Sequence, residues 1–141
     1  MIRQFRSSDT DVVMKIWLDA SIVAHDFISP SYWQEQFSVV RDQYLPISET
    51  YVFVEDDLIR GFVSILDRNI IGALFVAPNF QRQSIGSALI RYVQEIAKDL
   101  TLCVYVENSA AKIFYEKFGF VIMLRRSTET GHDEYMMRFG E

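Results

Sequence analysis

Apolar positions in the first third of the chain predict one short strand followed by two amphipathic helices. Residues 2–5 are expected to form the short strand. Asp9 then precedes a helix in which apolar side chains recur about every 3.6 residues. These side chains are Val13, Ile16, Trp17, Ala20 and Ala24. The helix is expected to end near His25.

A second helix is predicted from its start and stop signals. Ser29 followed by Pro30 is typical of a helix N-terminus, and Pro46 is expected to end the helix. The apolar stripe between these limits consists of Trp33, Phe37, Val40 and Tyr44.

Three strands are expected next, at residues 50–55, 58–66 and 70–76. Asp56 and Asp57 fit a two-residue hairpin turn between the first two strands. Asp67-Arg68-Asn69 turns the chain into the third strand, and Gly72 inside that strand indicates a β-bulge.

The remainder of the chain alternates between helix and strand. A helix beginning near Ser84 places its apolar residues on one face: Ile85, Leu89, Val93 and Ile96. A strand at 101–106, a helix at 109–118 closed by Gly119, and a hairpin of 120–127 with 134–139 follow. This order predicts a mixed α/β fold in a single domain, residues 1–141, with helices on both faces of the sheet.

Composition narrows the class of protein. The chain has 141 residues, half of them hydrophobic, which is enough for a proper core. No secretory signal is visible, and the longest apolar runs are far shorter than the about 20 residues that span a membrane. A cytoplasmic protein without a membrane partner is therefore expected. The single cysteine, Cys103, lies in an apolar run and is expected in the core. The formal net charge of −5 argues against a nucleic-acid partner, and two histidines with one cysteine indicate no metal site.

A polar break between the strand ending at Val76 and the next helix carries the first chemical signal. It contains Gln81, Arg82, Gln83, Ser84 and Gly86. The unpaired N–H groups and positive dipole end of a helix N-terminus favour phosphate. Neither a dinucleotide fingerprint nor a P-loop is present. The break therefore fits either a phosphate cradle or a plain connection in which Gly86 permits close packing.

Two motifs in order make the assignment more specific. Gln81-x-x-Ser84-x-Gly86 matches the acyl-CoA loop pattern Q/R-x-x-G-x-G/A, except that Ser84 replaces the first glycine. A second pattern, N-x-x-A-x-x-F-Y-x-x-x-G-F, is matched downstream by Asn108, Ala111, Phe114, Tyr115, Gly119 and Phe120. With both motifs, the chain resembles the GNAT superfamily of N-acetyltransferases. The segment His25-Asp26-Phe27-Ile28 is similar to that of a group of small bacterial members.

The resemblance implies the GNAT fold, with about seven strands in a mixed, mostly antiparallel sheet, and acetyl-CoA as co-substrate without a metal. Backbone groups of the strand and loop would hold the CoA, and Tyr115 would protonate the departing thiolate, because a phenol is protonated at neutral pH. The expected CoA-binding residues are Leu74, Phe75, Val76, Gln81, Arg82, Gln83, Ser84, Ile85, Gly86, Ser87 and Asn108.

The acceptor side is less defined. His25, Tyr32 and Ile70 are candidate substrate contacts, while Trp33 suits the helix core and His132 the surface. A general base could be His25, or Asp67 or Glu107. The acceptor could be a protein lysine, a peptide N-terminus or a small amine. The alternatives to an enzyme of this kind are a catalytically weak acyl-CoA-binding or regulatory module and, against the acidic charge, an enzyme that acetylates aminoacyl-tRNA. Either a monomer or a homodimer is compatible with the sequence.

Overall fold

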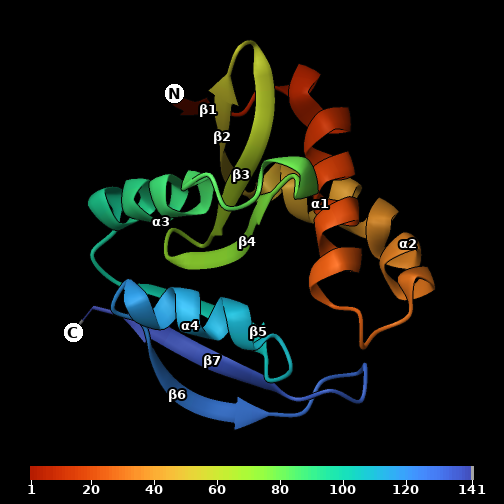
Figure 1. The fold of residues 1–141 in the computed structure, drawn as a ribbon, viewed down its shortest axis with the longest axis vertical. Helices are drawn as coiled ribbons and strands as arrows, with labels where there is room; N and C mark the ends of the chain where they lie inside the picture. The colour runs from red at the N-terminus through yellow and green to blue at the C-terminus, as the bar shows by residue number, and fades with distance from the viewer. Residues whose placement is uncertain (141) are drawn as a thin grey trace.

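A computed structural model describes residues 1–140, and its elements follow the expected order (Figure 1). The α-helices are α1 (Thr10–Ala24), α2 (Pro30–Val39), α3 (Ile85–Ile96) and α4 (Ser109–Lys117). The strands are β1 (Ile2–Gln4), β2 (Glu49–Glu55), β3 (Leu58–Leu66), β4 (Ile70–Val76), β5 (Leu100–Tyr105), β6 (Val121–Arg126) and β7 (Glu134–Phe139). Short 3-10 turns occupy Ser7–Asp9, Leu45–Ile47 and Pro78–Phe80, and a π-helix occupies Val40–Tyr44.

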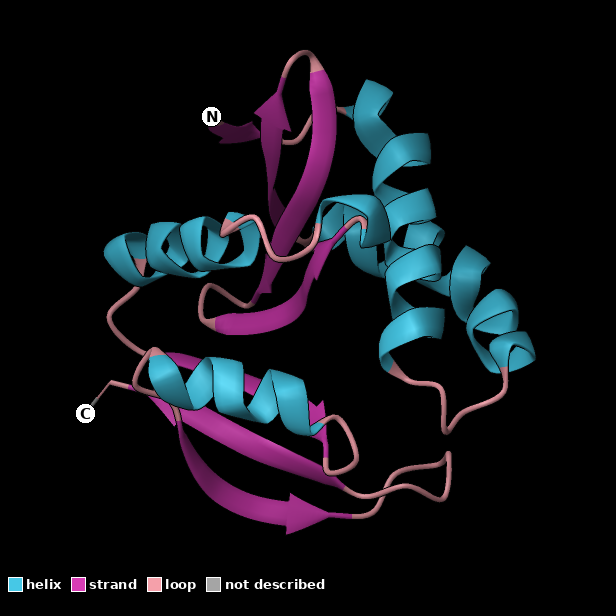
Figure 2. Ribbon diagram, viewed as in Figure 1, coloured by secondary structure: helices cyan, strands magenta, loops and turns pink. Residues whose placement is uncertain are grey.

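The seven strands form one sheet in the order β1-β2-β3-β4-β5-β7-β6. Every neighbouring pair is antiparallel except β4 and β5, which are parallel and are connected through α3. The expected mixed, mostly antiparallel sheet is confirmed. Figure 2 shows the helices arranged around this sheet.

Alternating strand residues build two cores, one on each face of the sheet. Val63 and Ile65 face the core formed with α3 and α4, whereas Val52 and Phe62 face the core formed with α1 and α2. The α1–α2 layer packs over β2 to β4, and the α4 layer packs over β5 and β7.

The turn and bulge expected from the sequence are both present. Asp56 and Asp57 have φ angles of 54° and 62°, as a tight hairpin turn requires. Across β3 and β4, Ser64 pairs with Ala73 and Ile65 pairs with Ile71, so Gly72 has no counterpart and forms the bulge.

β4 and β5 separate almost as soon as they meet. Their only cross-strand pair in the described part of the chain is Ile70 with Thr101, where the Thr101 N–H also donates to the Asn69 carbonyl at 2.9 Å. Beyond that point the two strands run apart, and Figure 1 shows the opening between the two halves of the sheet. One edge of β4 is therefore left without a neighbouring strand in the middle of the molecule.

Four expectations about individual residues were wrong. Cys103 is exposed, because β5 alternation turns Leu102 and Val104 into one core, and on the opposite face of β5 Tyr105, but not Cys103, packs against the α1–α2 core. The second helix changes to a π-helix at Val40 instead of running to Pro46, and Tyr44 is 49% exposed.

The other two corrections concern helix ends. Ile96 is 49% exposed because it is the last residue of α3. Asp9 begins α1 but does not cap it with its side chain. Its carboxylate instead accepts hydrogen bonds from the Arg3 guanidinium and the Arg6 N–H. Among residues 1–140, none of the helices combines the length and apolar character needed to cross a bilayer.

Candidate active site

A cleft of about 510 Å³ lies between β4, α3 and α4, and we call it the CoA-side cleft. It is lined by every residue expected to bind CoA except Gln83, and also by Tyr115. Three small side chains that were not expected at the site also line it: Ala20 and Ala24 of α1, and Ala110 of α4. The structure thus brings the two sequence motifs together on opposite walls of one cleft.

The loop before α3 presents its backbone to this cleft. Ser84 precedes the first helical residue, Ile85, and its hydroxyl makes no capping hydrogen bond, so side chains leave the N–H groups of the first turn available. The exposed Arg82 adds a positive charge beside them. Gln81 fixes the loop, because its Nε2 donates to the Val76 carbonyl at 3.2 Å. These groups suit a pyrophosphate.

Ser84 has a left-handed backbone, with φ = 64° and ψ = 16°. This conformation costs about 1–2 kcal/mol for a residue with a Cβ and is tolerated best by glycine. Ser84 therefore has the left-handed backbone that the glycine of the loop pattern would adopt most readily.

Gly86 is not required by tight packing. A Cβ at this position would lie 3.5 Å from Phe114 Cζ and 3.8 Å from Val76 Cγ2, which are ordinary contact distances. Phe114, Val76 and Gly86 all line the CoA-side cleft, so the added atom would occupy cleft space. The geometry therefore favours a phosphate-binding loop over a plain connection in which Gly86 only permits close packing.

A second cavity, of about 260 Å³, lies on the other side of the opening between β4 and β5, and we call it the acceptor-side cavity. Its walls come from α1, α2, α4, β4 and β5, with Glu134 of β7. Five residues line both this cavity and the CoA-side cleft: Leu74, Phe75, Asn108, Ala111 and Tyr115.

Tyr115 is held where the two spaces meet. Its ring packs edge-on against Phe114 and Phe120, with centroids 5.1 and 5.5 Å away, and the residue is 8% exposed. Burial raises the pKa of Tyr115, so the hydroxyl is protonated at neutral pH. Within the described chain its Oη has no hydrogen-bond partner, which leaves the proton available to a bound molecule.

Asn108 connects the two motifs to the acceptor side. Its Oδ1 accepts from the Ala111 N–H at 3.2 Å, which caps α4 and turns Nδ2 toward His25 Nε2, 3.4 Å away. Since Nδ2 can only donate, Nε2 accepts and the imidazole proton lies on Nδ1. Burial lowers the pKa of His25, so the ring is neutral. In this tautomer His25 has no free lone pair with which to deprotonate an amine.

One face of α1 forms the inner wall of the acceptor-side cavity. Trp17, Ser21 and His25 follow one another at four-residue intervals and all line it. Trp33 stacks on His25, with ring centroids 5.0 Å apart and an interplanar angle of 29°. Trp33 is buried as expected, and it also lines the cavity. The signal that sequence analysis missed was Ser21, a polar residue on an apolar helix face.

The other acceptor-side candidates lie outside this cavity. Tyr32 donates to Glu129 Oε1 at 2.8 Å, joining α2 to the loop between β6 and β7. Ile70 sits at the junction with Thr101 and is 37% exposed, and its neighbour Ile71 lines the cavity instead.

The remaining candidate bases are also displaced from Tyr115. Asp67 lies in the turn before β4. Glu107 forms a short hydrogen bond with His132, whose ring also contacts Phe27 at 5.1 Å between centroids. His132 was expected at the surface and is half-buried. None of these three side chains lines either cavity.

The chain is similar to known proteins in both sequence and fold. A model of the acetyltransferase (GNAT) domain matches residues 46–122. The chain is 39% identical over 123 residues to the peptidyl-lysine N-acetyltransferase YiaC of Escherichia coli K12, covering 87% of this chain and 84% of YiaC. It is 33% identical to peptidyl-lysine N-acetyltransferase YjaB of Salmonella typhimurium LT2, covering 91% and 88%. The solution structure of apo YjaB from Escherichia coli superimposes with a TM-score of 0.84 at 27% identity, covering 100% of this chain and 98% of that one.

Proposed function

Because the chain belongs to the GNAT family of N-acetyltransferases, we propose that it transfers the acetyl group of acetyl-CoA directly to the side-chain amine of a lysine in a protein or peptide. The observation that carries this proposal is the position of Tyr115, which lines both the CoA-side cleft and the acceptor-side cavity. A donor and an acceptor entering from opposite sides of the sheet would meet at this residue.

The backbone would hold the donor. The N–H groups of residues 81–87 and the Arg82 guanidinium would bind the pyrophosphate, and the unpaired edge of β4 would hydrogen-bond the extended pantetheine as an added strand does. A backbone N–H of Phe75 or Val76 would then face the thioester oxygen and stabilise its developing negative charge. Asn108 borders both spaces and would contact the pantetheine arm.

Tyr115 would supply the proton that the reaction needs. The amine nitrogen forms a bond to the carbonyl carbon, the carbon–sulfur bond breaks, and Tyr115 Oη donates its proton to the sulfur. The nitrogen loses one proton, and the Tyr115 oxygen regains one, so the phenol is restored and the overall charge balances.

We assign no side chain as general base. His25 is neutral with its acceptor nitrogen occupied by Asn108, and Asp67 and Glu107 lie away from Tyr115. The reactive amine would therefore arrive in its neutral form. His25 would act by fixing the orientation of Asn108 and by forming the cavity wall with Trp33.

A polypeptide lysine is favoured over a small amine by two observations. The relatives YiaC and YjaB are named peptidyl-lysine N-acetyltransferases. Carboxylates also lie near the acceptor-side cavity, with Glu134 in its wall and Glu107, Glu129 and Asp133 on nearby segments. Glu134 and Asp133 form ion pairs with Arg126 and Arg125, so Glu107 and Glu129 would supply the negative charge that attracts a cationic lysine.

The test begins with calorimetric titration of acetyl-CoA. We expect micromolar binding that Arg82→Ala weakens several-fold, with Gln83→Ala as the matched control, because Gln83 is adjacent but does not line the cleft. Lysine peptides and small amines are then compared as acceptors by mass spectrometry. Binding without acetylation of any acceptor would favour the binding-module alternative, and the absence of binding would exclude the proposed site.

A further inference from the structure

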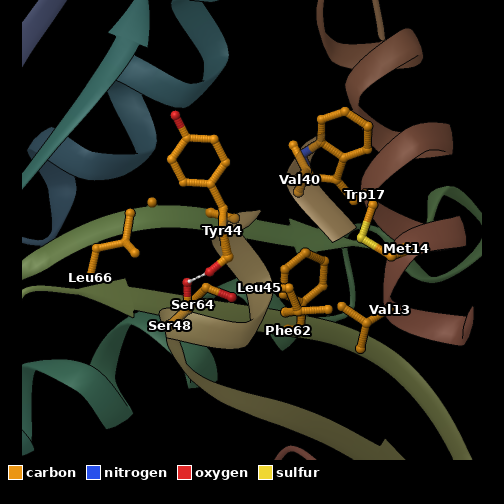
Figure 3. Close-up of a pocket in the computed structure, with 12 residues that line it drawn as sticks. Val13, Met14, Trp17, Val40, Tyr44, Leu45, Ser48, Phe62, Ser64 and Leu66 are labelled. Carbon is orange, nitrogen blue, oxygen red and sulfur yellow. Dashed lines mark hydrogen bonds between the residues drawn. The ribbon is translucent and has the colours of Figure 1, made fainter. Parts of the chain in front are cut away.

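A third cavity lies beside the acceptor-side cavity, between α1, the π-helix and the β3–β4 hairpin (Figure 3). Its volume is about 230 Å³, and we call it the side pocket. Most of its wall is made by large apolar side chains: Met14, Trp17, Val40, Leu45, Phe62 and Leu66. Sequence analysis placed several of these residues on helix faces but gave no sign of a cavity between them.

The chemistry of the side pocket suits an apolar group. None of the described residues lining it carries a charge. Its two serines are already engaged: Ser48 Oγ donates to the Tyr44 carbonyl at 2.6 Å, and Ser64 Oγ hydrogen-bonds Thr50 Oγ1 at 2.7 Å. Both hydroxyls already share a hydrogen bond within the protein, so a polar or charged ligand would gain little from them and would lose its hydration on entry.

The size of the pocket limits its occupant. Sites for drug-sized ligands usually exceed about 300 Å³. A space of about 230 Å³ is smaller than this and matches one side chain of the size of leucine or phenylalanine. Tyr44, at 49% exposed, also lines it, so the pocket communicates with solvent and is not a sealed void.

The side pocket adjoins the place where the acceptor would lie. Trp17, Gly72 and Ala73 line both the side pocket and the acceptor-side cavity. The wall between the two cavities is thin where β4 forms it, because Gly72 has no side chain and Ala73 has a single methyl group. Next along β4, Leu74 and Phe75 border the same space as Tyr115.

The separation along β4 sets the distance to the reaction. Gly72–Ala73 and Leu74–Phe75 are one to three residues apart, which is about 3–10 Å at the rise of an extended strand. An acceptor chain in extended conformation covers the same distance with about one to three residues.

We propose that the side pocket binds an apolar side chain of the acceptor polypeptide, within about three residues of the lysine that is acetylated. This inference rests on the proposed function and adds a sequence preference to it. A free amine or a lysine among polar neighbours would leave the side pocket unused. The enzyme would therefore select lysines that have a large apolar neighbour.

The test measures kcat/KM on a set of lysine peptides that differ at one position. Leucine replaces alanine in turn at each of about three positions on either side of the lysine. We expect one position at which leucine raises kcat/KM by about tenfold or more, as filling an apolar pocket typically does. Acetylation of the all-alanine peptide reports on the proposed function separately from the preference.

Two tryptophan variants of the π-helix locate the effect. Val40→Trp fills the side pocket and should reduce the leucine-to-alanine ratio to near one. Gln43→Trp is the matched control, because Gln43 is exposed on the same π-helix and does not line the pocket; it should keep the wild-type ratio. Each ratio is measured within one protein, so a general loss of activity cancels, and acetyl-CoA affinity verifies that each variant is folded.

The possible outcomes separate the two claims. A peptide set acetylated with equal kcat/KM at every leucine position overturns the side-pocket proposal and leaves the acetyltransferase intact. A preference that survives Val40→Trp overturns it as well, since another surface must then read the leucine. Failure to acetylate any peptide, with acetyl-CoA bound, overturns the lysine-acceptor function and the preference together.

Discussion

Replacing Tyr115 with phenylalanine removes one atom, Oη, from the junction of the two cavities. A positioned general acid typically contributes about 10²- to 10⁴-fold to the rate, equivalent to about 3–5 kcal/mol of barrier. Within the described chain Oη makes no hydrogen bond, and the ring contacts with Phe114 and Phe120 remain in the variant. We therefore expect kcat to fall by about two orders of magnitude or more, with a stability change within about 0.5 kcal/mol.

The pH dependence of the wild-type protein tests the same assignment. A lysine amine with a pKa of about 10.4 is neutral in about one molecule in 2,500 at pH 7, and this fraction rises about tenfold per pH unit. Burial raises the pKa of Tyr115, so the phenol stays protonated while the amine becomes reactive. We expect kcat/KM to rise from pH 7 to about pH 9 with no falling limb in that range.

The assay follows release of the CoA thiol with a lysine peptide as acceptor, and thermal unfolding is measured in parallel. Tyr92→Phe is the matched control. Tyr92 lies on α3, packs against Tyr51 of β2 and lines neither cavity. Activity of Tyr115→Phe within twofold of the wild type would refute the acid assignment. A rate that declines above pH 8 would show that the acid has a lower pKa than its burial implies.

Three further substitutions test the loop, the cavity wall and the first helix. Ser84→Gly relieves a left-handed residue and is expected to raise the free energy of unfolding by up to about 1 kcal/mol and to tighten acetyl-CoA binding; weaker binding by calorimetry would mean that the hydroxyl is a ligand. Burial lowers the pKa of His25, so protonation of its ring favours the unfolded chain. The free energy of unfolding of the wild type, measured in urea, should therefore fall as the pH drops below about 6.5. The variant His25→Gln should flatten that decline. Asp9→Asn should lower the free energy of unfolding by about 1–3 kcal/mol at pH 7, because it removes a carboxylate that accepts hydrogen bonds from Arg3. These hydrogen bonds lower the pKa of Asp9, so its ionised form stabilises the fold above the ordinary value of 3.8. The difference from the wild type should vanish as the pH falls through the lowered pKa.

The sequence predicted the order of elements because their signals are local. Periodicity, the Asp56-Asp57 turn and the Gly72 bulge depend on a few neighbouring residues, and each is present in the structure. Errors arose where tertiary contacts decide. Cys103 lies in an apolar run, yet the α1–α2 core on its side of β5 includes Tyr105 and stops short of Cys103, which leaves the cysteine exposed. Such a layer boundary has no signature in a short stretch of sequence.

The candidate site was predicted unevenly for a related reason. The CoA-side residues form two contiguous motifs, and the structure places almost all of them around one cleft. The acceptor-side cavity is assembled from single residues on α1, α2, β5 and β7, such as Ser21, Trp33 and Tyr105. No spacing rule joins such residues before the fold is known. The side pocket was invisible for the same reason, since it is a space between elements that individually have ordinary core patterns.

The single cross-strand pair between β4 and β5 gives the protein an interruption at its centre that only an extended molecule can bridge. A donor bound there would connect the two halves of the sheet, and binding at a concentration one hundred times Kd adds about 2.7 kcal/mol to the free energy of unfolding. Because degradation often proceeds through transiently opened states, the half-life of the protein would lengthen when the donor is plentiful and shorten when it is scarce. The amount of enzyme, and not only its saturation, would then follow the acetyl supply.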